Sequence, residues 1–184
     1  MSEVPPPPER FKVVVLSLSN VLKIELDKAR DDGIEVVGGN IVDFGIEFMK
    51  GSEPFSFIDK FVSRSFVRQQ DGSYICCWDY VKDKNRDYFL KNTSFIFGEL
   101  PSGIIDGIKV VLENEEESRE LMESIWKHLF SLIKISINHI YLSRKPSIKK
   151  TDQGFNISYT QEYYSHVNIE DLSQKWGVDL MKAR

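Results

Sequence analysis

The segment from Asn114 to Lys134 limits the possible folds more than any other part of the sequence. Its apolar residues recur every three or four positions, the spacing of one face of an α-helix. These residues are Leu121, Met122, Ile125, Trp126, Leu129, Phe130, Leu132 and Ile133. Asn114 is a favourable N-cap, and Glu117 follows three residues later as in a capping box. The pattern predicts one long helix over about 114–134, with Trp126, Leu129 and Phe130 in the core, and its broad apolar face requires a large partner.

Most of the remaining chain suggests strands, because apolar, β-branched and aromatic residues alternate with polar ones or form short apolar runs. The segments with this pattern are Phe11–Leu26, Val42–Phe48, Tyr74–Val81, Tyr88–Phe97, Ile104–Leu112, Lys134–Leu142 and Phe155–Tyr163. Asp71-Gly72 marks a hairpin turn before Tyr74. Ser52–Ser63 suits a short helix or a strand, and we favour the helix. The predicted fold class is α+β: a twisted, mostly antiparallel sheet packed on the long helix, with a short C-terminal helix beginning after Asn168.

Length and composition predict a single domain with an N-terminal arm. The chain has 184 residues, of which 41% are hydrophobic, and four consecutive prolines (Pro5, Pro6, Pro7 and Pro8) stand near its start. Because consecutive prolines favour a polyproline II segment, residues 1–10 are predicted to be a disordered arm that can bind a partner, and residues 11–184 a single α+β domain. We expect a cytoplasmic protein, because the first residues do not resemble a signal peptide and no apolar stretch is long enough to span a bilayer.

The sequence offers little support for catalysis or for a metal site. It contains no Gly-x-Ser-x-Gly elbow, no phosphate-cradling loop and no His-Glu-x-x-His pair. The adjacent cysteines Cys76 and Cys77 lack the two-residue spacing that brings two thiolates to one zinc ion. We therefore predict a protein without enzymatic activity and without a cofactor.

A basic loop provides the main candidate binding site. Arg144, Lys145, Lys149 and Lys150 cluster in a stretch where no acidic residue intervenes. Four cations can hold anionic lipid at about 1 kcal/mol each near a membrane surface. They can equally contact phosphate groups or simply keep a hairpin soluble, and the sequence leaves these three interpretations open. A formal net charge of −4 argues against a protein that binds nucleic acid over its whole surface.

Two other segments suggest nucleic-acid binding, each with a simpler structural explanation. Tyr74, Trp78 and Tyr80 would share one face of a strand, where they could stack on bases, although an aromatic face packed on the long helix is the favoured interpretation. Leu172–Asp179 has the pattern of a helix-turn-helix and resembles a stretch of copia-type retroelement polyproteins. Only Leu180–Arg184 follows, which is too short for a recognition helix, so an amphipathic terminal helix is favoured.

The order of elements in residues 104–166 resembles the C-terminal part of rhabdovirus matrix proteins. The resemblance rests on the apolar stretch Gly107–Leu112, the acidic run Glu113–Glu117, a helix containing Ile125-Trp126-Lys127-His128-Leu129-Phe130, and a following hairpin. An arm with consecutive prolines is similar too, although it lacks the tyrosine of the budding motif that binds WW domains and the lysine cluster of that family.

The resemblance implies a viral structural protein of the matrix type. Such a protein would associate with itself and bridge the nucleocapsid and the membrane during assembly, in the host cytoplasm, in the virion and at the inner membrane surface. Because the N-terminal arm has no lysine cluster, Arg144, Lys145, Lys149 and Lys150 would make the contact with anionic lipid. The alternatives from other classes are a nucleic-acid-binding accessory protein, such as an RNA silencing suppressor or a retroelement-derived protein, and an enzyme of unrecognised type.

Overall fold

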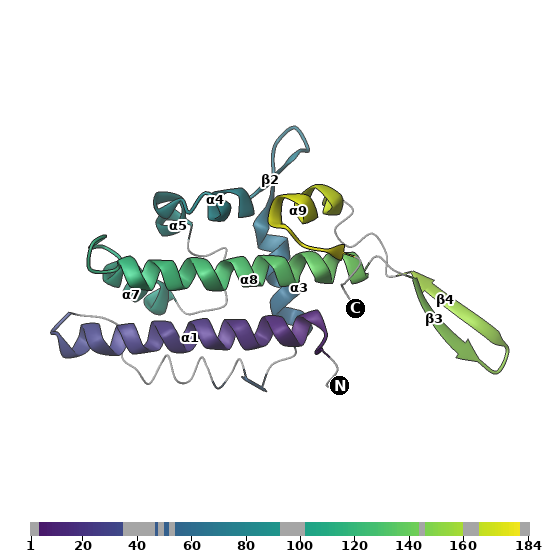
Figure 1. The fold of residues 1–184 in the computed structure, drawn as a ribbon, viewed down its shortest axis with the longest axis horizontal. Coiled ribbons are helices and arrows are strands. Elements are labelled where there is room, and N and C mark those ends of the chain that lie inside the picture. Colours follow the sequence, from purple (N-terminus) through teal and green to yellow (C-terminus); the bar gives the residue numbers. More distant parts are fainter. Residues whose placement is uncertain are drawn as a thin grey trace.

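The computed structural model describes residues 4–34, 47, 50–51, 54–92, 102–143, 146–159 and 166–180. Two helices of 25 residues each, α1 (Pro7–Asp31) and α8 (Arg119–Ser143), lie side by side and run in opposite directions (Figure 1). The shorter helices pack around this pair: α3 (Pro54–Ser65), α4 (Trp78–Lys82), α5 (Arg86–Lys91), α7 (Ser102–Val111) and α9 (Ile169–Trp176). The body of the protein is therefore helical.

The described strands form two separate antiparallel hairpins. β1 (Phe66–Arg68) pairs with β2 (Tyr74–Cys76), and β3 (Pro146–Thr151) pairs with β4 (Gly154–Tyr159). The β1–β2 turn contains Gly72 at φ +87°, a left-handed conformation that favours glycine. Helices and antiparallel strands thus occur together, as an α+β chain requires. The predicted twisted sheet is absent from the described residues, where each sheet has only two strands.

α8 is the centre of the core, and its surroundings explain the largest error of the sequence analysis. Its buried residues extend around the helix, because α1, α4 and α9 all contact it. Ile135, Ile137 and His139 are buried, and so are Ile133, Ser136 and Ile140 between and beside them. A helix that is apolar on several sides loses the pattern of a single stripe. The alternation in Lys134–Leu142 therefore suggested a strand, whereas this segment is the last part of α8.

Several other segments that were predicted to be strands are also helical in the structure. Phe11–Leu26 lies in α1, and its buried residues Phe11, Leu18, Leu22 and Leu26 follow helical spacing. Ile104–Leu112 falls mainly in α7, Tyr74–Val81 is a strand only as far as Cys76 before α4 begins, and Tyr88–Lys91 belongs to α5. Val42–Phe48, apart from Glu47, and the residues after Asn92 in the predicted strand Tyr88–Phe97 lie outside the described part of the chain.

Three predicted helices are confirmed, with changed boundaries for two of them. α8 begins at Arg119, five residues later than predicted, because Asn114 caps a turn instead: its Oδ1 accepts hydrogen bonds from the backbone of Glu116 and Glu117. The helix favoured over Ser52–Ser63 is α3. In α9, Asn168 is the N-cap as predicted, and Gly177 ends the helix at φ +63° in a left-handed C-cap.

The apolar core joins the small helices to the long pair. Trp78 of α4 is fully buried, with its ring 6.2 Å from that of Phe61 in α3 and 5.2 Å from that of Phe66 in β1. Trp126 and Leu129 are buried as predicted, whereas Phe130 is only partly buried. Trp126 packs against Phe89 of α5, at 5.7 Å between ring centroids, and not against a β-sheet.

The N-terminal prolines begin a helix. Pro6 is the N-cap of α1, and its carbonyl accepts hydrogen bonds from the backbone of Glu9 and Arg10. Pro7 and Pro8 occupy the first turn, where a missing N–H costs nothing, and both are buried. The predicted disordered arm over residues 1–10 is therefore wrong for Pro7–Arg10, and buried prolines do not present themselves to a partner.

Candidate functional site

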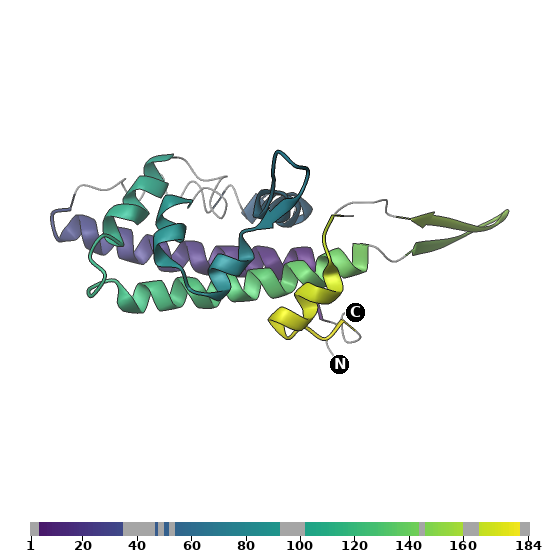
Figure 2. The same ribbon diagram turned by 90° about the horizontal axis from the view of Figure 1, so that it is seen from above.

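The β3–β4 hairpin, which carries part of the predicted basic site, projects away from the helical body. In two views at right angles it extends beyond the end of the molecule where α8 finishes (Figures 1 and 2). β3 and β4 pair with each other, and neither makes extensive contacts with any described helix. An isolated two-stranded hairpin is only marginally stable in water. Packing on another surface would therefore increase the stability of this hairpin.

Of the four predicted cations, the structure describes two, Lys149 and Lys150. Lys149 and Lys150 are neighbours in β3, where Lys149 is paired in register with Asn156 and Lys150 with Phe155. Arg144 and Lys145 lie outside the described residues. The hairpin loop between the strands is Asp152-Gln153, so the prediction of a hairpin with a basic tip is corrected: the two described lysines lie within the strand.

The register of the hairpin separates apolar from polar positions. The pairs Pro146–Tyr159, Ile148–Ile157 and Lys150–Phe155 alternate with the pairs Ser147–Ser158, Lys149–Asn156 and Thr151–Gly154. Alternate pairs of a two-stranded ribbon belong to the same face. One face therefore has mostly apolar residue types and the other mostly polar ones, and each face has one lysine position.

Charge is unevenly distributed between residues 143–159, which contain the hairpin and the residues just before it, and the rest of the chain. Residues 143–159 contain four cations and one acidic residue, a formal net charge of +3, so the rest of a chain with a net charge of −4 carries −7. The acidic residues include Glu113, Glu115, Glu116 and Glu117, all exposed in the turn before α8. That turn lies at the opposite end of the long helices from the hairpin (Figure 2).

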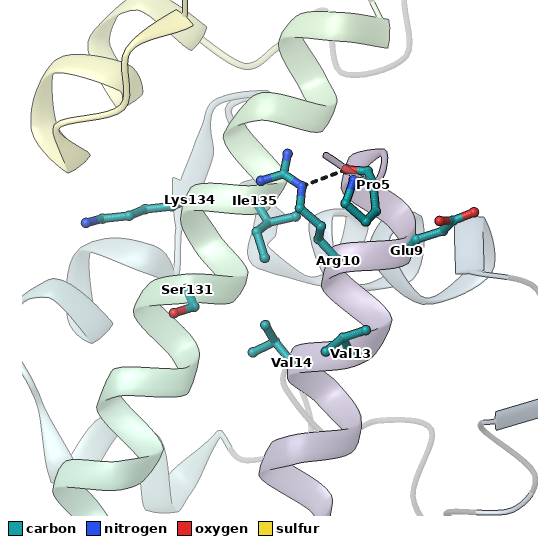
Figure 3. Close-up of a pocket in the computed structure, with 8 residues that line it drawn as sticks. All are labelled: Pro5, Glu9, Arg10, Val13, Val14, Ser131, Lys134 and Ile135. Carbon is teal, nitrogen blue, oxygen red and sulfur yellow. Dashed lines mark hydrogen bonds between the residues drawn. The ribbon is translucent and has the colours of Figure 1, made fainter. Parts of the chain in front are cut away.

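A second candidate site is a groove between the first turns of α1 and the middle of α8. It has a volume of about 580 Å³. Its lining residues come from the start of the chain, from α1 and from α8 (Figure 3): Pro5, Glu9, Arg10, Val13, Val14, Ser131, Lys134 and Ile135. Arg10 Nε donates a hydrogen bond of 3.0 Å to the carbonyl of Pro5. We call this site the α1–α8 groove; the sequence analysis missed it because it predicted a disordered arm and a strand where α1 lies.

Ser17 and His128 form a hydrogen-bonded pair that resembles a nucleophile with its base. His128 Nε2 lies 3.0 Å from Ser17 Oγ, and its Nδ1 lies 2.7 Å from the carbonyl of Ser124. Since a carbonyl can only accept, Nδ1 carries a hydrogen and, in the neutral ring, Nε2 accepts from the serine. Both residues lie inside long helices, where backbone N–H groups bond within the helix, so these helices offer no free backbone N–H beside the serine to stabilise an oxyanion. The pair joins α1 to α8.

Another histidine pair lies inside the body. His139 is 5% exposed, and its Nε2 lies 3.0 Å from Oδ1 of Asp59 in α3. This contact ties α3 to α8. Among the described residues, no three His, Cys, Asp or Glu side chains are grouped as a metal site would require, and no described helix is both long and apolar enough to cross a bilayer.

Cys76 and Cys77 lie at the end of β2 in a setting that suppresses thiolate formation. Burial raises the pKa of Cys76 to about 12, with a further contribution from the carboxylate of Asp79. Burial also raises the pKa of Cys77, whose sulfur accepts a hydrogen bond of 2.9 Å from the hydroxyl of Tyr88. Thiolates, not thiols, are the reactive form, so neither cysteine is suited to act as a nucleophile.

This setting predicts a loss of stability in alkali. The folded pKa of Cys76, about 12, exceeds the unfolded value of 9.0, so its contribution to stability is complete below pH 9 and is lost as the pH rises towards 12. Urea unfolding of the wild type and of Cys76→Ala, measured by circular dichroism between pH 8 and pH 11, should show a smaller alkaline loss in the variant. Equal alkaline losses of stability in the two proteins would mean that groups other than Cys76 cause the loss. A thiol reagent at pH 8 should label both cysteines only after unfolding.

The aromatic residues considered for base stacking do not form one platform. Tyr74 lies in β2, where it stacks on His166 at 4.1 Å, whereas Trp78 and Tyr80 belong to α4 and Trp78 is fully buried. In α9, Ile169, Leu172 and Trp176 are buried, and Trp176 packs on Phe130 of α8. The terminal segment is therefore an amphipathic helix, as the simpler explanation predicted. Comparisons with protein-family models, curated proteins and solved structures found no match to this chain.

Proposed function

We propose that this protein is a non-enzymatic assembly protein of the matrix type, which associates with itself and contacts anionic membrane through the β3–β4 hairpin. The observation that supports the proposal is the hairpin itself: a cationic, amphipathic arm that projects from an otherwise acidic body. An anionic surface attracts the arm and repels the body, so it orients the molecule with the hairpin towards the membrane.

The strength of one hairpin indicates why self-association belongs to the proposal. Each Lys or Arg near an anionic membrane contributes about 1 kcal/mol, so residues 143–159, with a net charge of +3 that includes Arg144 and Lys145 before the hairpin, contribute only about 3 kcal/mol. This corresponds to a dissociation constant weaker than about 1 mM. Linking two or more hairpins in one assembly raises the overall affinity by about 10²–10⁴-fold without any new type of contact. In the same assembly, the acidic ends of the bodies would remain available for a nucleocapsid partner.

The nucleic-acid-binding alternative has less support. The cations of the hairpin suit phosphate as well as lipid, but the body is acidic and the aromatic residues that would stack on bases are divided between two elements, one of them in the core. Binding of short RNA with a steep salt dependence and no binding to vesicles would favour this alternative.

The test is flotation of the full-length protein with vesicles, combined with sedimentation velocity. We expect the protein to float with phosphatidylserine-rich vesicles and not with pure phosphatidylcholine vesicles. Flotation should increase steeply with protein concentration, over the range in which sedimentation shows oligomers. High salt should release the protein, because the Debye length falls from about 10 Å at 0.1 M to about 3 Å at 1 M. A protein that stays monomeric at high concentration and does not float would contradict the proposal.

A further inference from the structure

We propose that the α1–α8 groove binds the anion of a single-chain fatty acid, with the alkyl chain between the two helices and the carboxylate on the guanidinium of Arg10. This inference does not depend on the hairpin or on the proposed membrane contact. It rests on the lining of the groove, on the hydrogen bonding of Arg10 and on the direction of the charged side chains around it.

The inner part of the groove suits an alkyl chain. Ile135 is buried and Val14 is partly buried, while Val13 is 67% exposed on the α1 side. Figure 3 shows Val14 on the side of α1 that faces α8 and Ile135 on α8 near Arg10, with Val13 on α1 and Ser131 on α8 beside them. A volume of about 580 Å³ lies within the range of about 300–1,000 Å³ that is usual for small-molecule sites. Filling the groove with methylene groups removes apolar surface of both partners from water.

The mouth of the groove suits a carboxylate. Arg10 extends over it towards Ile135, and the hydrogen bond from Nε to the Pro5 carbonyl holds the side chain in this direction (Figure 3). The two terminal nitrogens have no hydrogen bond or ion pair with any described residue. A guanidinium whose outer edge is unoccupied presents two parallel N–H donors, the geometry that a carboxylate accepts in a bidentate pair.

The neighbouring charges favour an anion at Arg10 and give Lys134 a smaller role. Glu9, the only acidic residue among the described lining residues, points away from Arg10 in Figure 3 and leaves the guanidinium unneutralised. Lys134 lines the groove too, but its ammonium extends from α8 away from Arg10. It therefore adds attraction at longer range, while Arg10 makes the direct contact. A cationic or neutral amphiphile would leave the guanidinium unpaired beside an apolar surface.

The test is isothermal titration calorimetry of the full-length protein with laurate below its micelle concentration. We expect saturable binding of one laurate per protein, and decanoate should bind more weakly, by up to about fourfold for each methylene removed. Dodecan-1-ol and dodecylamine, which have the same chain length and a different head group, should bind at least about tenfold more weakly, because they cannot form the charge-assisted pair. Absence of saturable laurate binding, or equal affinity for laurate and dodecylamine, would overturn the proposal.

Matched variants identify the site. Arg10→Gln should weaken laurate binding by about tenfold to a hundredfold, Arg10→Lys should be intermediate, and Lys134→Gln should weaken it by less than about threefold. Ser131→Phe, on the exposed side of α8, should fill the groove and remove binding. Arg30→Gln, at the other end of α1, is the control and should keep wild-type affinity. Circular dichroism checks that each variant is folded; a folded Arg10→Gln protein with wild-type affinity would exclude this groove.

One further variant separates this inference from the proposed function. Lys149→Glu/Lys150→Glu changes the hairpin, and it should leave laurate binding in the groove unchanged. Loss of laurate binding in the hairpin variant would place the fatty acid elsewhere and overturn the assignment to Arg10.

Discussion

Reversal of two charges in the hairpin, Lys149→Glu/Lys150→Glu, is expected to abolish flotation with phosphatidylserine-rich vesicles. Each substitution replaces an attraction of about 1 kcal/mol with a repulsion of similar size, so the two together weaken binding by about 4 kcal/mol, or about a thousandfold. Both residues lie in β3, on opposite faces by register, so the prediction requires only that the hairpin as a whole approaches the membrane. Flotation at a protein concentration where the wild type is fully bound measures the effect.

The matched control is Lys91→Glu/Lys127→Glu. These lysines are exposed on α5 and α8, and the double change alters the net charge of the protein by the same amount. We expect the control to float nearly as well as the wild type, because its added negative charges lie on the body and not on the projecting arm. Equal loss in both double variants would mean that total charge, and not the hairpin, determines membrane binding.

Truncation of Trp78 to alanine is expected to be the most destabilising single change, at about 3–5 kcal/mol in the free energy of unfolding. Trp78 is fully buried and is the aromatic link between α4, Phe61 of α3 and Phe66 of β1. A loss of this size is a large fraction of the stability of a typical domain, about 5–15 kcal/mol. Urea unfolding followed by circular dichroism at 222 nm measures the change.

Two further variants provide reference values for the loss of stability in Trp78→Ala. Trp78→Phe keeps an aromatic ring and removes an indole N–H that is buried without a partner among the described residues. It should therefore cost much less than alanine. Tyr74→Ala, at a position that is 40% exposed, should cost less than about 1.5 kcal/mol. If Trp78→Ala unfolds at the same urea concentration as Tyr74→Ala, the packing of α4 on α3 contributes little to stability.

Local signals in the sequence correctly predicted several elements. Asp71-Gly72 marked the β1–β2 turn, and the alternation of Phe155, Ile157 and Tyr159 marked β4, because both features depend on near neighbours in the chain. The cap at Asn168 and the spacing of Ile169, Leu172 and Trp176 likewise predicted α9. In each case the residues that determine the conformation lie within one turn or one hairpin of each other.

The same local signals were misleading where helices are buried on several sides. α1 contains Val13-Val14-Val15, a β-branched run with high strand propensity, yet Leu18, Leu22 and Leu26 hold it as a helix against α8 and α3. Gly103 and Gly107 lower the helix propensity of α7, whose buried Ile108 nevertheless packs in the core. Contacts with other helices outweighed local propensity at these positions.

The candidate sites were only partly predictable for a related reason. The cations of residues 144–150 and their net charge can be read directly, but the projection of the hairpin depends on where α8 ends. The α1–α8 groove joins Pro5 and Arg10 to residues more than a hundred positions later. Ser17 and His128 are separated by 111 positions and were not expected to meet.

The sequence by itself determined the charge of the hairpin, its strand alternation, the central helix and the terminal cap, because each follows from residues close together in the chain. Only the tertiary structure decided that the apolar face of α8 packs on α1 and not on a sheet, that the prolines begin a helix, and that Arg10 lies over an apolar groove. These features depend on which apolar surfaces pack together and leave water. That packing is decided by contacts between segments that are far apart in the chain.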